Sequence, residues 1–363
     1  MRYEKIEALR QALHRSPERS DQEYQTIEKL QLFLRENTTL ELHAKTGWFY
    51  ALHREAHAPQ TIAVRADMDA IENSHGQLFH GCGHDGHSAI LAGLGLALEG
   101  KTLGKNVCLV FQPGEETGTG GKRVSRELFQ ELRPDFMLGC HNIPGKPLGT
   151  VLLRKNTFAC ASMGLSLTVT GRQSHAAYPE QGENPVFLLS EIVLALPNLI
   201  HHITHGDPER LLMATVVQMK VGERNFGVSA GTGTLALTLR AYRQEDMETL
   251  ERAILDMAQT GCERAGMTWQ SSRQDVFPDT VNRPVCCVRV ADILREHHLP
   301  TQVLSEPMRW SEDFGWYLQE VPGMYLGLGA GEDHCGLHTD GYEFPDALLE
   351  PAINVLETLV RAL

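Results

Sequence analysis

The stretch His80-Gly-Cys-Gly-His-Asp-Gly-His87 places three histidines, a thiol and a carboxylate within eight residues. Its three glycines let the backbone turn tightly, so side chains close in sequence can converge on one point. An apolar segment at 88–98 follows directly and predicts a helix. We therefore expect the cluster to lie on a loop that enters this helix, and the rest of the fold to bring further ligands to it.

Four apolar segments, at 61–66, 106–112, 135–140 and 323–329, run into or lie just before acidic or histidine side chains. They read as buried strands that alternate with helices, which implies a parallel sheet. In such sheets, sites form beyond the carboxyl ends of the strands. The side chains that we expect to share one crevice with Cys82 and His84 are Asp67, Glu115, Glu116, His141 and His338.

The middle of the chain has a different pattern. Its order of segments is strand, helix, strand, strand, helix, strand, which is typical of a ferredoxin-like unit. Because the α/β pattern resumes afterwards, this unit reads as an insertion. We predict an α/β fold with a mixed, largely parallel sheet and helices on both faces in 1–160 and 277–363, plus an inserted ferredoxin-like α+β domain in 161–276.

Composition narrows the class of protein. A chain of 363 residues is long enough for two domains. It is 42% hydrophobic and 22% charged, which is ordinary for a soluble globular protein. A formal net charge of −13 argues against nucleic acid or an anionic membrane as partner. We expect no apolar run of transmembrane length, and the N-terminus is too charged for a signal peptide. Without a secretory signal, the eight cysteines predict free thiols or metal ligands and a cytoplasmic location.

Thiolate, imidazole and carboxylate together suit zinc, and carboxylate-rich sites also admit manganese. The set is larger than one tetrahedral ion with an open position needs, whereas two ions about 3.5–4 Å apart would use it better. A role as an ordinary loop residue is at least as well supported for His75, His80, His87 and His334 individually. Supporting roles behind a ligating imidazole are open to Asp67, Asp85 and His87.

The adjacent carboxylates Glu115 and Glu116 suggest a division of labour, in which one binds metal and the other serves as a base. The rival interpretation is nucleophilic catalysis by Cys82 paired with His84 or His87. A nucleophile does not require a Glu-Glu pair and a remote histidine at strand ends, so the surplus of ligands favours metal. His175, among small residues at 171–179, could approach a substrate closely or be a plain loop histidine.

Several of these motifs together resemble the M20 metallopeptidase family. The resemblance covers nearly the full length and is nearest to the amidohydrolases that include hippurate hydrolase, indole-acetyl-amino-acid hydrolases and N-acyl-amino-acid deacetylases. The matching segments are Arg65–Ala70, His80–His87, Phe111–Glu116, His141, Gly171–Pro179 and Ser311–Phe314.

The resemblance implies two divalent ions, with zinc or manganese expected, held by Cys82 as the bridging ligand and by His84, Glu116, His141 and His338. It makes Glu115 the general base and Asp67 a supporting aspartate. It makes His175 a lid histidine that reaches the partner's site in a homodimer, and Arg240 the arginine that holds the substrate carboxylate.

The function implied is a metal-dependent amidohydrolase that cleaves N-acyl, for example N-acetyl, amino acids or related small amides through a metal-activated water. A dipeptidase or carboxypeptidase on the same scaffold is one alternative. A catalytically silent metal-binding homologue is another, although an idle site has no need for an intact base at Glu115.

Three departures from the family pattern stand out. The link from Asp69 to His80 is short, which changes one wall of the pocket. Gly227-Val-Ser-Ala230 stands where the family often has Asn-Val-Ile-Pro, so an asparagine that helps to anchor substrate is missing. His338 is followed by Thr-Asp-Gly without the proline that commonly comes two residues later.

Overall fold

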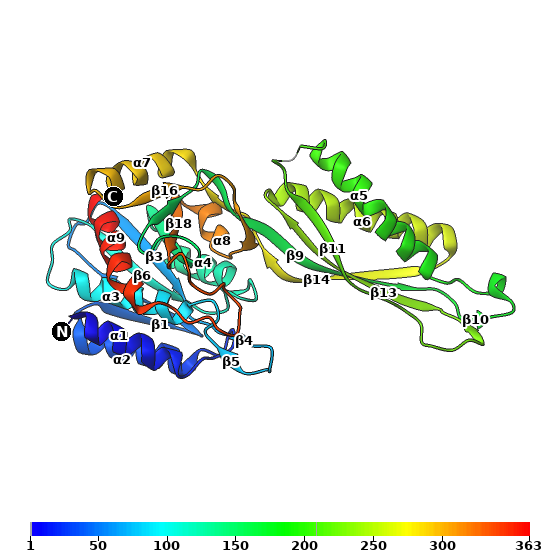
Figure 1. Ribbon diagram of the computed structural model, residues 1–363, viewed down its shortest axis with the longest axis horizontal. Coiled ribbons are helices and arrows are strands. Elements are labelled where there is room, and N and C mark those ends of the chain that lie inside the picture. The colour runs from blue at the N-terminus through cyan, green and yellow to red at the C-terminus, as the bar shows by residue number, and fades with distance from the viewer. Residues whose placement is uncertain (1, 208) are drawn as a thin grey trace. The chain divides into compact units, whose positions relative to one another are not determined.

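The computed structural model describes residues 2–207 and 209–363 (Figure 1). The chain divides into two compact units, and each is described by itself. Unit 1 comprises the chain up to Phe158 together with Thr280–Pro307 and Glu312–Leu363. Unit 2 comprises Ala159–Asp279 and the short segment Met308–Ser311. Unit 2 is therefore an insertion within the sequence of unit 1.

Unit 1 is built on an eight-stranded sheet in the order β1-β2-β6-β3-β7-β18-β8-β16. Its central pairs β6–β3, β3–β7 and β7–β18 are parallel, whereas β1, β2 and the β18–β8 pair are antiparallel. The prediction of a mixed, largely parallel sheet is thus confirmed. The strands are β1 Glu41–Lys45, β2 Trp48–His53, β3 Thr61–Asp67, β6 Asn106–Gln112, β7 Phe136–Ile143, β8 Val151–Leu153, β16 Thr301–Val303 and β18 Gly323–Gly329.

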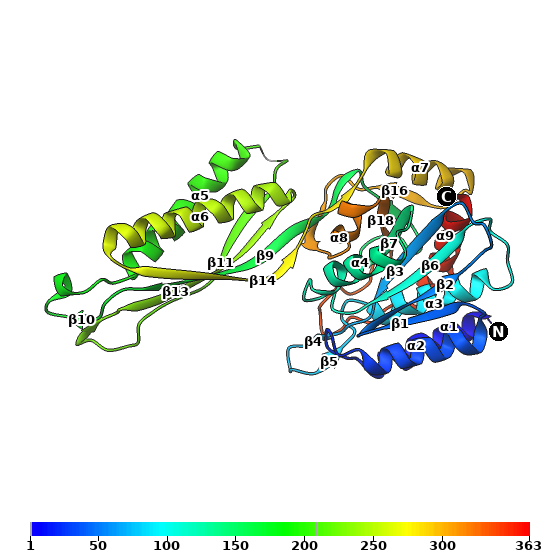
Figure 2. The ribbon, with the colours of Figure 1, turned by 180° about the vertical axis from the view of Figure 1, so that it is seen from behind.

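Helices cover both faces of this sheet (Figures 1 and 2). Five of them share one large apolar core with the strands, and α4 and α8 pack on the opposite face. Leucine, isoleucine and valine recur on the inner stripe of the core helices, and burying this stripe drives their packing. The helices are α1 Arg2–His14, α2 Tyr24–Asn37, α3 His84–Leu98, α4 Gly120–Glu131, α7 Pro284–Glu296, α8 Gly315–Glu320 and α9 Leu349–Ala362.

Helix α3 begins earlier than the apolar pattern predicts. Its first residue is His84, so His84, Asp85 and His87 lie in the first turn of the helix and not on the loop before it. The apolar run marks only the later part of the helix. The first turn is buried as well, but its residues are polar, so an apolar pattern does not reveal it. The polar residues of this turn are therefore held by a rigid element at the centre of unit 1.

Unit 2 has the predicted order of elements. Its sheet runs β11-β13-β9-β14 with every neighbouring pair antiparallel, and its own apolar core lies between this sheet and the helices α5 and α6. The elements are β9 Asn156–Thr170, α5 Val186–Thr204, β11 Leu212–Val221, β13 Thr232–Ala241, α6 Gln244–Ala265 and β14 Thr268–Phe277.

Helix α5 contradicts the expectation that the chain has no apolar run of transmembrane length. It is 19 residues long with a window of mean hydropathy 1.6, so within residues 2–207 and 209–363 it is the one helix long and apolar enough to cross a membrane. Length and hydropathy alone are weak evidence for a span, because core helices of soluble proteins pass the same test. Its inner face, with Leu189 and Ile192, packs into the core of unit 2, whereas Phe187 and Leu194 are each 77% exposed.

A buried charge network joins three segments of unit 1. Arg65, in β3, is 2% exposed and donates to Asp67 Oδ2 at 2.7 Å, to Asp313 Oδ1 at 2.6 Å and to Gln112 Oε1 at 2.9 Å. Glu312 Oε1 lies 3.1 Å from the same guanidinium group. One cation therefore faces three buried carboxylates from two distant parts of the sequence.

We predict that Arg65→Met destabilises metal-free unit 1 by about 3–5 kcal/mol, because removing one partner leaves buried charge uncompensated. The measurement is the free energy of unfolding from chemical denaturation. The matched control is Arg54→Met, which removes an exposed pair with Glu41 and should cost about 1 kcal/mol or less. Equal losses in the two variants would contradict the role assigned to Arg65.

Candidate active site

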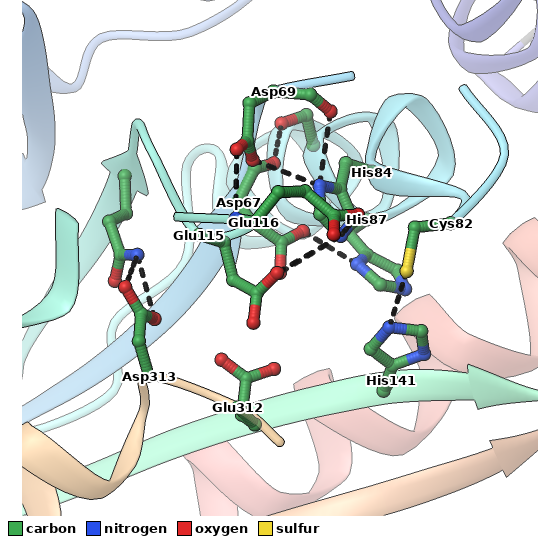
Figure 3. Close-up of polar contacts among 12 residues, drawn as sticks. Asp67, Asp69, Cys82, His84, His87, Glu115, Glu116, His141, Glu312 and Asp313 are labelled. Carbon is green, nitrogen blue, oxygen red and sulfur yellow. Dashed lines mark hydrogen bonds and ion pairs between the residues drawn. The ribbon is translucent and has the colours of Figure 1, made fainter. Parts of the chain in front are cut away.

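Two of the predicted metal ligands lie where the chain enters α3: Cys82 precedes the helix, and His84 is its first residue (Figure 3). Gly83 between them has φ +92°, and a Cβ there would lie 2.8 Å from Asn142 Oδ1 and 2.9 Å from the Tyr342 hydroxyl oxygen. Both the backbone angle and the lack of space require glycine at this position. The tight turn directs the thiol and the imidazole into the same space.

The other three predicted ligands come from the carboxyl edge of the sheet. Glu116 follows β6, His141 lies near the end of β7, and His338 lies in the loop after β18. Cys82 Sγ is 3.3 Å from His141 Nε2 and 3.3 Å from His338 Nε2. His338 Nε2 is in turn 3.5 Å from Glu116 Oε1.

These five side chains form two groups of donor atoms, and Cys82 belongs to both. Within each group the donor atoms all lie within 4.8 Å of one another. A thiolate shared by two groups is the arrangement expected of a bridging ligand. The groups are Cys82, His84 and His141, and Cys82, Glu116 and His338.

The donor set fits a pair of divalent metal ions. His84 Nε2 and Glu116 Oε1 are buried, and neither has a hydrogen-bond partner among the described residues. A buried polar atom without a partner is costly, and a metal ion would satisfy both atoms. Cysteine, histidine and glutamate are also the side chains from which zinc sites are built.

The protonation of the donors also bears on metal binding. Burial, with His87 adding to it, holds the pKa of His141 well below its usual range, so this imidazole is neutral and ready to bind. Burial alone would lower the pKa of His84, but Asp67 and Asp69 raise it to about 10. Burial and the neighbouring Glu116 raise the pKa of the Cys82 thiol. Metal must therefore displace protons from His84 and Cys82.

Asp69 is a functional residue that the sequence analysis did not single out. Its Oδ1 accepts from His84 Nδ1 at 3.0 Å, which leaves Nε2 of that ring for the metal (Figure 3). Its Oδ2 accepts from the backbone N–H of Glu116 at 2.9 Å and from the Ser20 hydroxyl at 2.7 Å. Its one sequence signal is its place two residues after Asp67 at the end of a buried strand.

Asp67, predicted as the supporting aspartate, mainly holds other groups. Its carboxylate accepts from His87 Nδ1 at 2.6 Å and from Arg65, while its Oδ2 is 3.8 Å from His84 Nε2. His87 Nε2 faces Asn142 Oδ1 at 2.5 Å. Through His87, Asp67 therefore links the Arg65 network to Asn142, the residue that follows the predicted ligand His141.

Asp85, the second predicted supporting residue, is directed to other partners. Its Oδ2 lies 2.8 Å from His14 Nδ1 and 3.6 Å from Arg10 Nη1, both on α1. The reason is helical geometry, because adjacent residues of a helix point in different directions and His84 already faces the donor set. Asp85 therefore fastens α1 to α3, and does not orient a ligand.

Glu115, the predicted general base, is 5% exposed, and its Oε2 lies 3.8 Å from His84 Nε2. Its carboxyl oxygen also lies within 4.8 Å of carboxyl oxygens of Glu312 and Asp313, which are both buried (Figure 3). Burial, then the neighbouring charges of Glu312 and Glu116, raise the pKa of Glu115 well above its usual range. Surroundings that favour the neutral form of a carboxyl group suit it to hold a proton and pass it on.

His175 and Arg240 belong to unit 2. His175 is exposed on the short strand β10, Ser174–His175, which pairs with β12, Val228–Ser229. Its Nδ1 accepts the N–H of Ala177 at 3.0 Å, so the ring proton lies on Nε2.

Arg240 Nη1 donates to the backbone oxygen of Arg309 at 2.5 Å and to Ser311 Oγ at 2.8 Å. Both partners are neutral, so these contacts orient the guanidinium group and leave its positive charge uncompensated.

Residues 63–362 match the model of Peptidase family M20/M25/M40. An N-acetyldiaminopimelate deacetylase of Bacillus subtilis is 29% identical over 384 residues, covering 100% of this chain and 98% of that protein. An N-acetyl-L-cysteine deacetylase of the same species is 27% identical over 91% of this chain and 81% of its own length. A hippurate hydrolase of Campylobacter jejuni is 26% identical over 96% and 93% of the two chains.

The fold comparison agrees with the sequence comparison. A dinuclear metal binding peptidase from the M20 family of Bacillus subtilis has a TM-score of 0.79 with 20% identity, covering 99% of this chain and 97% of that one. The match of the family model extends over most of unit 1 and all of unit 2. The chain therefore belongs to peptidase family M20/M25/M40, and within it to the amidohydrolase branch.

Proposed function

We propose that this protein hydrolyses the amide bond of N-acyl amino acids, with N-acetyl amino acids as the first class to test. One observation carries the proposal: Glu115 is a buried carboxyl group beside five metal-donor side chains, and buried donor atoms of that set lack hydrogen-bond partners among the described residues. The relatives named as N-acetyl deacetylases and as a hippurate hydrolase support the substrate class.

Cys82, His84, Glu116, His141 and His338 would hold two divalent ions. We propose zinc or manganese, because thiolate and imidazole suit zinc and carboxylate admits manganese. When bound, such a pair supplies Lewis-acid activation of a water molecule and of the substrate carbonyl.

Glu115 moves the proton. A carboxylate oxygen of Glu115 takes a proton from the water that attacks the carbonyl carbon, and then gives it to the nitrogen of the leaving amine. Burial and the neighbouring Glu312 favour the protonated form of Glu115, so the proton stays on this carboxyl group until it is transferred to the amine nitrogen. The products are a carboxylic acid and a free amino acid.

Substrate recognition is assigned to unit 2. The uncompensated guanidinium group of Arg240 suits the carboxylate of the amino acid. The contact with Ala177 that orients the His175 ring uses Nδ1 and not Nε2. The Nε2–H can therefore donate to the oxygen of the scissile carbonyl.

We also propose a homodimer formed through unit 2. Among the described residues, strand β11 is an edge strand that pairs only with β13, and it exposes the apolar side chains of Met213, Val216, Val217 and Met219. An exposed apolar edge is a template for pairing with another strand, and the same edge of a second copy would cover it. Phe187 and Leu194 on α5 extend the apolar surface.

We predict that Glu115→Gln lowers kcat by about 10³-fold, within the range known for a general base, while the metal content stays unchanged. The control is Glu131→Gln, on the exposed face of α4, which should leave kcat and metal content as in the wild type. Full activity of Glu115→Gln in single-turnover assays would remove Glu115 from the mechanism.

We predict that chelation abolishes amine release from N-acyl amino acids, and that zinc or manganese restores it. Cys82→Ser should lower the number of ions bound per chain, because it removes the donor shared by both groups. Cys335→Ser changes an exposed thiol and should bind metal as the wild type does. Release from peptides alone would indicate a dipeptidase or carboxypeptidase, and no release by metal-loaded protein would indicate a silent homologue.

We predict that Val217→Lys converts the dimer to a monomer in sedimentation experiments, since it places a charge on an apolar edge residue that is 65% exposed. Val285→Lys alters a residue of α7 that is 73% exposed and should leave the oligomeric state unchanged. A wild-type protein that sediments as a monomer at micromolar concentration would refute the dimer.

A further inference from the structure

The segment between α1 and α2, residues 15–23, contributes no metal donor but lies against the turn that carries Glu115. Ser20 donates to Asp69, and Asp21 accepts from Thr119 at 3.1 Å and from Arg123 at 2.7 Å. Glu23 accepts the backbone N–H of Gly114 at 2.8 Å. Three side chains of one short segment thus hold the surroundings of the catalytic carboxyl group.

Glu115 is flanked by two backbone contacts of this kind. The N–H of Gly114, directly before it, goes to Glu23 Oε1, and the N–H of Glu116, directly after it, goes to Asp69 Oδ2. The turn closes on itself through the N–H of Gly118, which donates to the carbonyl oxygen of Glu115 at 2.8 Å. The direction of the Glu115 side chain is therefore set by a turn whose two flanks are fixed by carboxyl groups.

Glu23 is an unusual residue to find in this place. It is 1% exposed; its Oε1 accepts from Gly114 and Asp21, and its Oε2 is buried with no hydrogen-bond partner among the described residues. Burial, with the nearby Asp69 adding to it, raises the pKa of Glu23 to about 8. A buried carboxyl group is costly, so its presence calls for a function that an apolar side chain could not serve.

The function that fits is that of an acceptor. Gly114 is buried, and without Glu23 its N–H would lose its partner. We propose that Glu23 is a positioning residue for the general base, because it fixes the turn that aims the Glu115 carboxyl group. This inference rests on the function proposed above. A displacement of about 1 Å at a catalytic group can cost about 10²-fold in rate.

The test compares three variants of Glu23. Glu23→Gln keeps the acceptor oxygen without an ionisable group, Glu23→Asp keeps the carboxyl group but is one methylene too short, and Glu23→Leu keeps the volume without an acceptor. We expect Glu23→Asp and Glu23→Leu to lower kcat by about 10- to 100-fold with KM within about 3-fold and metal content retained. Glu23→Gln should keep at least half of the wild-type kcat.

The control variant is Glu18→Ala. Glu18 lies in the same segment, but its carboxylate accepts from the backbone N–H groups of Gln25 and Thr26 at the start of α2. Its loss should lower stability and leave kcat unchanged. Should Glu23→Leu fail to fold, Glu23→Asp gives the same test with the carboxyl group retained.

A second measurement needs neither metal nor substrate. In hydrogen exchange of the metal-free protein, peptides that cover residues 112–119 should exchange at least 10-fold faster in Glu23→Asp and Glu23→Leu than in the wild type, Glu23→Gln or Glu18→Ala. If the wild type hydrolyses no amide, the proposed function fails, and the exchange result still decides whether Glu23 holds the turn. Unchanged exchange at 112–119, or a loss of kcat shared equally by Glu18→Ala, would overturn the proposal.

Discussion

The buried guanidinium group of Arg65 is the interaction on which the rest of unit 1 depends. It contacts Asp67 at the end of its own strand, and Asp313 and Glu312 from a segment almost 250 residues further along the chain. Although burial raises the pKa of Asp67, His84, His87 and Arg65 together hold it well below its usual range. Arg65 therefore joins the strand that ends at Asp67 to the segment that carries Glu312 and Asp313, and it adds to the effect of the two histidines on the pKa of Asp67.

The parallel sheet explains why residues so far apart in sequence meet. Strands β3, β6, β7 and β18 are neighbours whose carboxyl ends share one edge, so Asp67, Glu115 and His141 arrive close together. Helix α3 then presents His84 and the preceding Cys82 to this edge. Two of the five predicted donors lie on regular elements, His84 at the start of α3 and His141 in β7, whereas Cys82, Glu116 and His338 lie in the turns and loops that these elements hold in place.

The sequence was sufficient to predict this sheet edge and the inserted unit, because each depends on a local pattern, and it placed Glu116, His141 and His338 near Cys82 and His84; that these five bind metal stays a prediction drawn from the family resemblance. The ranges 106–112 and 323–329 coincide with β6 and β18. It was not sufficient for the groups behind the donors. Asp67 ends β3 and Asp69 follows two residues later, and only the turn of the chain decides that Asp69 orients His84. Likewise, no local pattern singles out Glu23, because its contact with Gly114 joins segments about 90 residues apart.

The insertion of unit 2 also has a consequence for the order in which the chain can fold. The four long strands and both helices of unit 2 are contiguous in sequence, so they are complete while β18 and α9 have yet to be synthesised. Until then, β7 lacks one parallel neighbour, and Arg65 lacks two of its three carboxylate partners. Pairing over such sequence distances is slow because loop closure must come first. Until β18 is synthesised, the sheet of unit 1 has an unpaired edge at β7. An unpaired edge strand promotes aggregation, so we expect the protein to be most prone to aggregate during this interval.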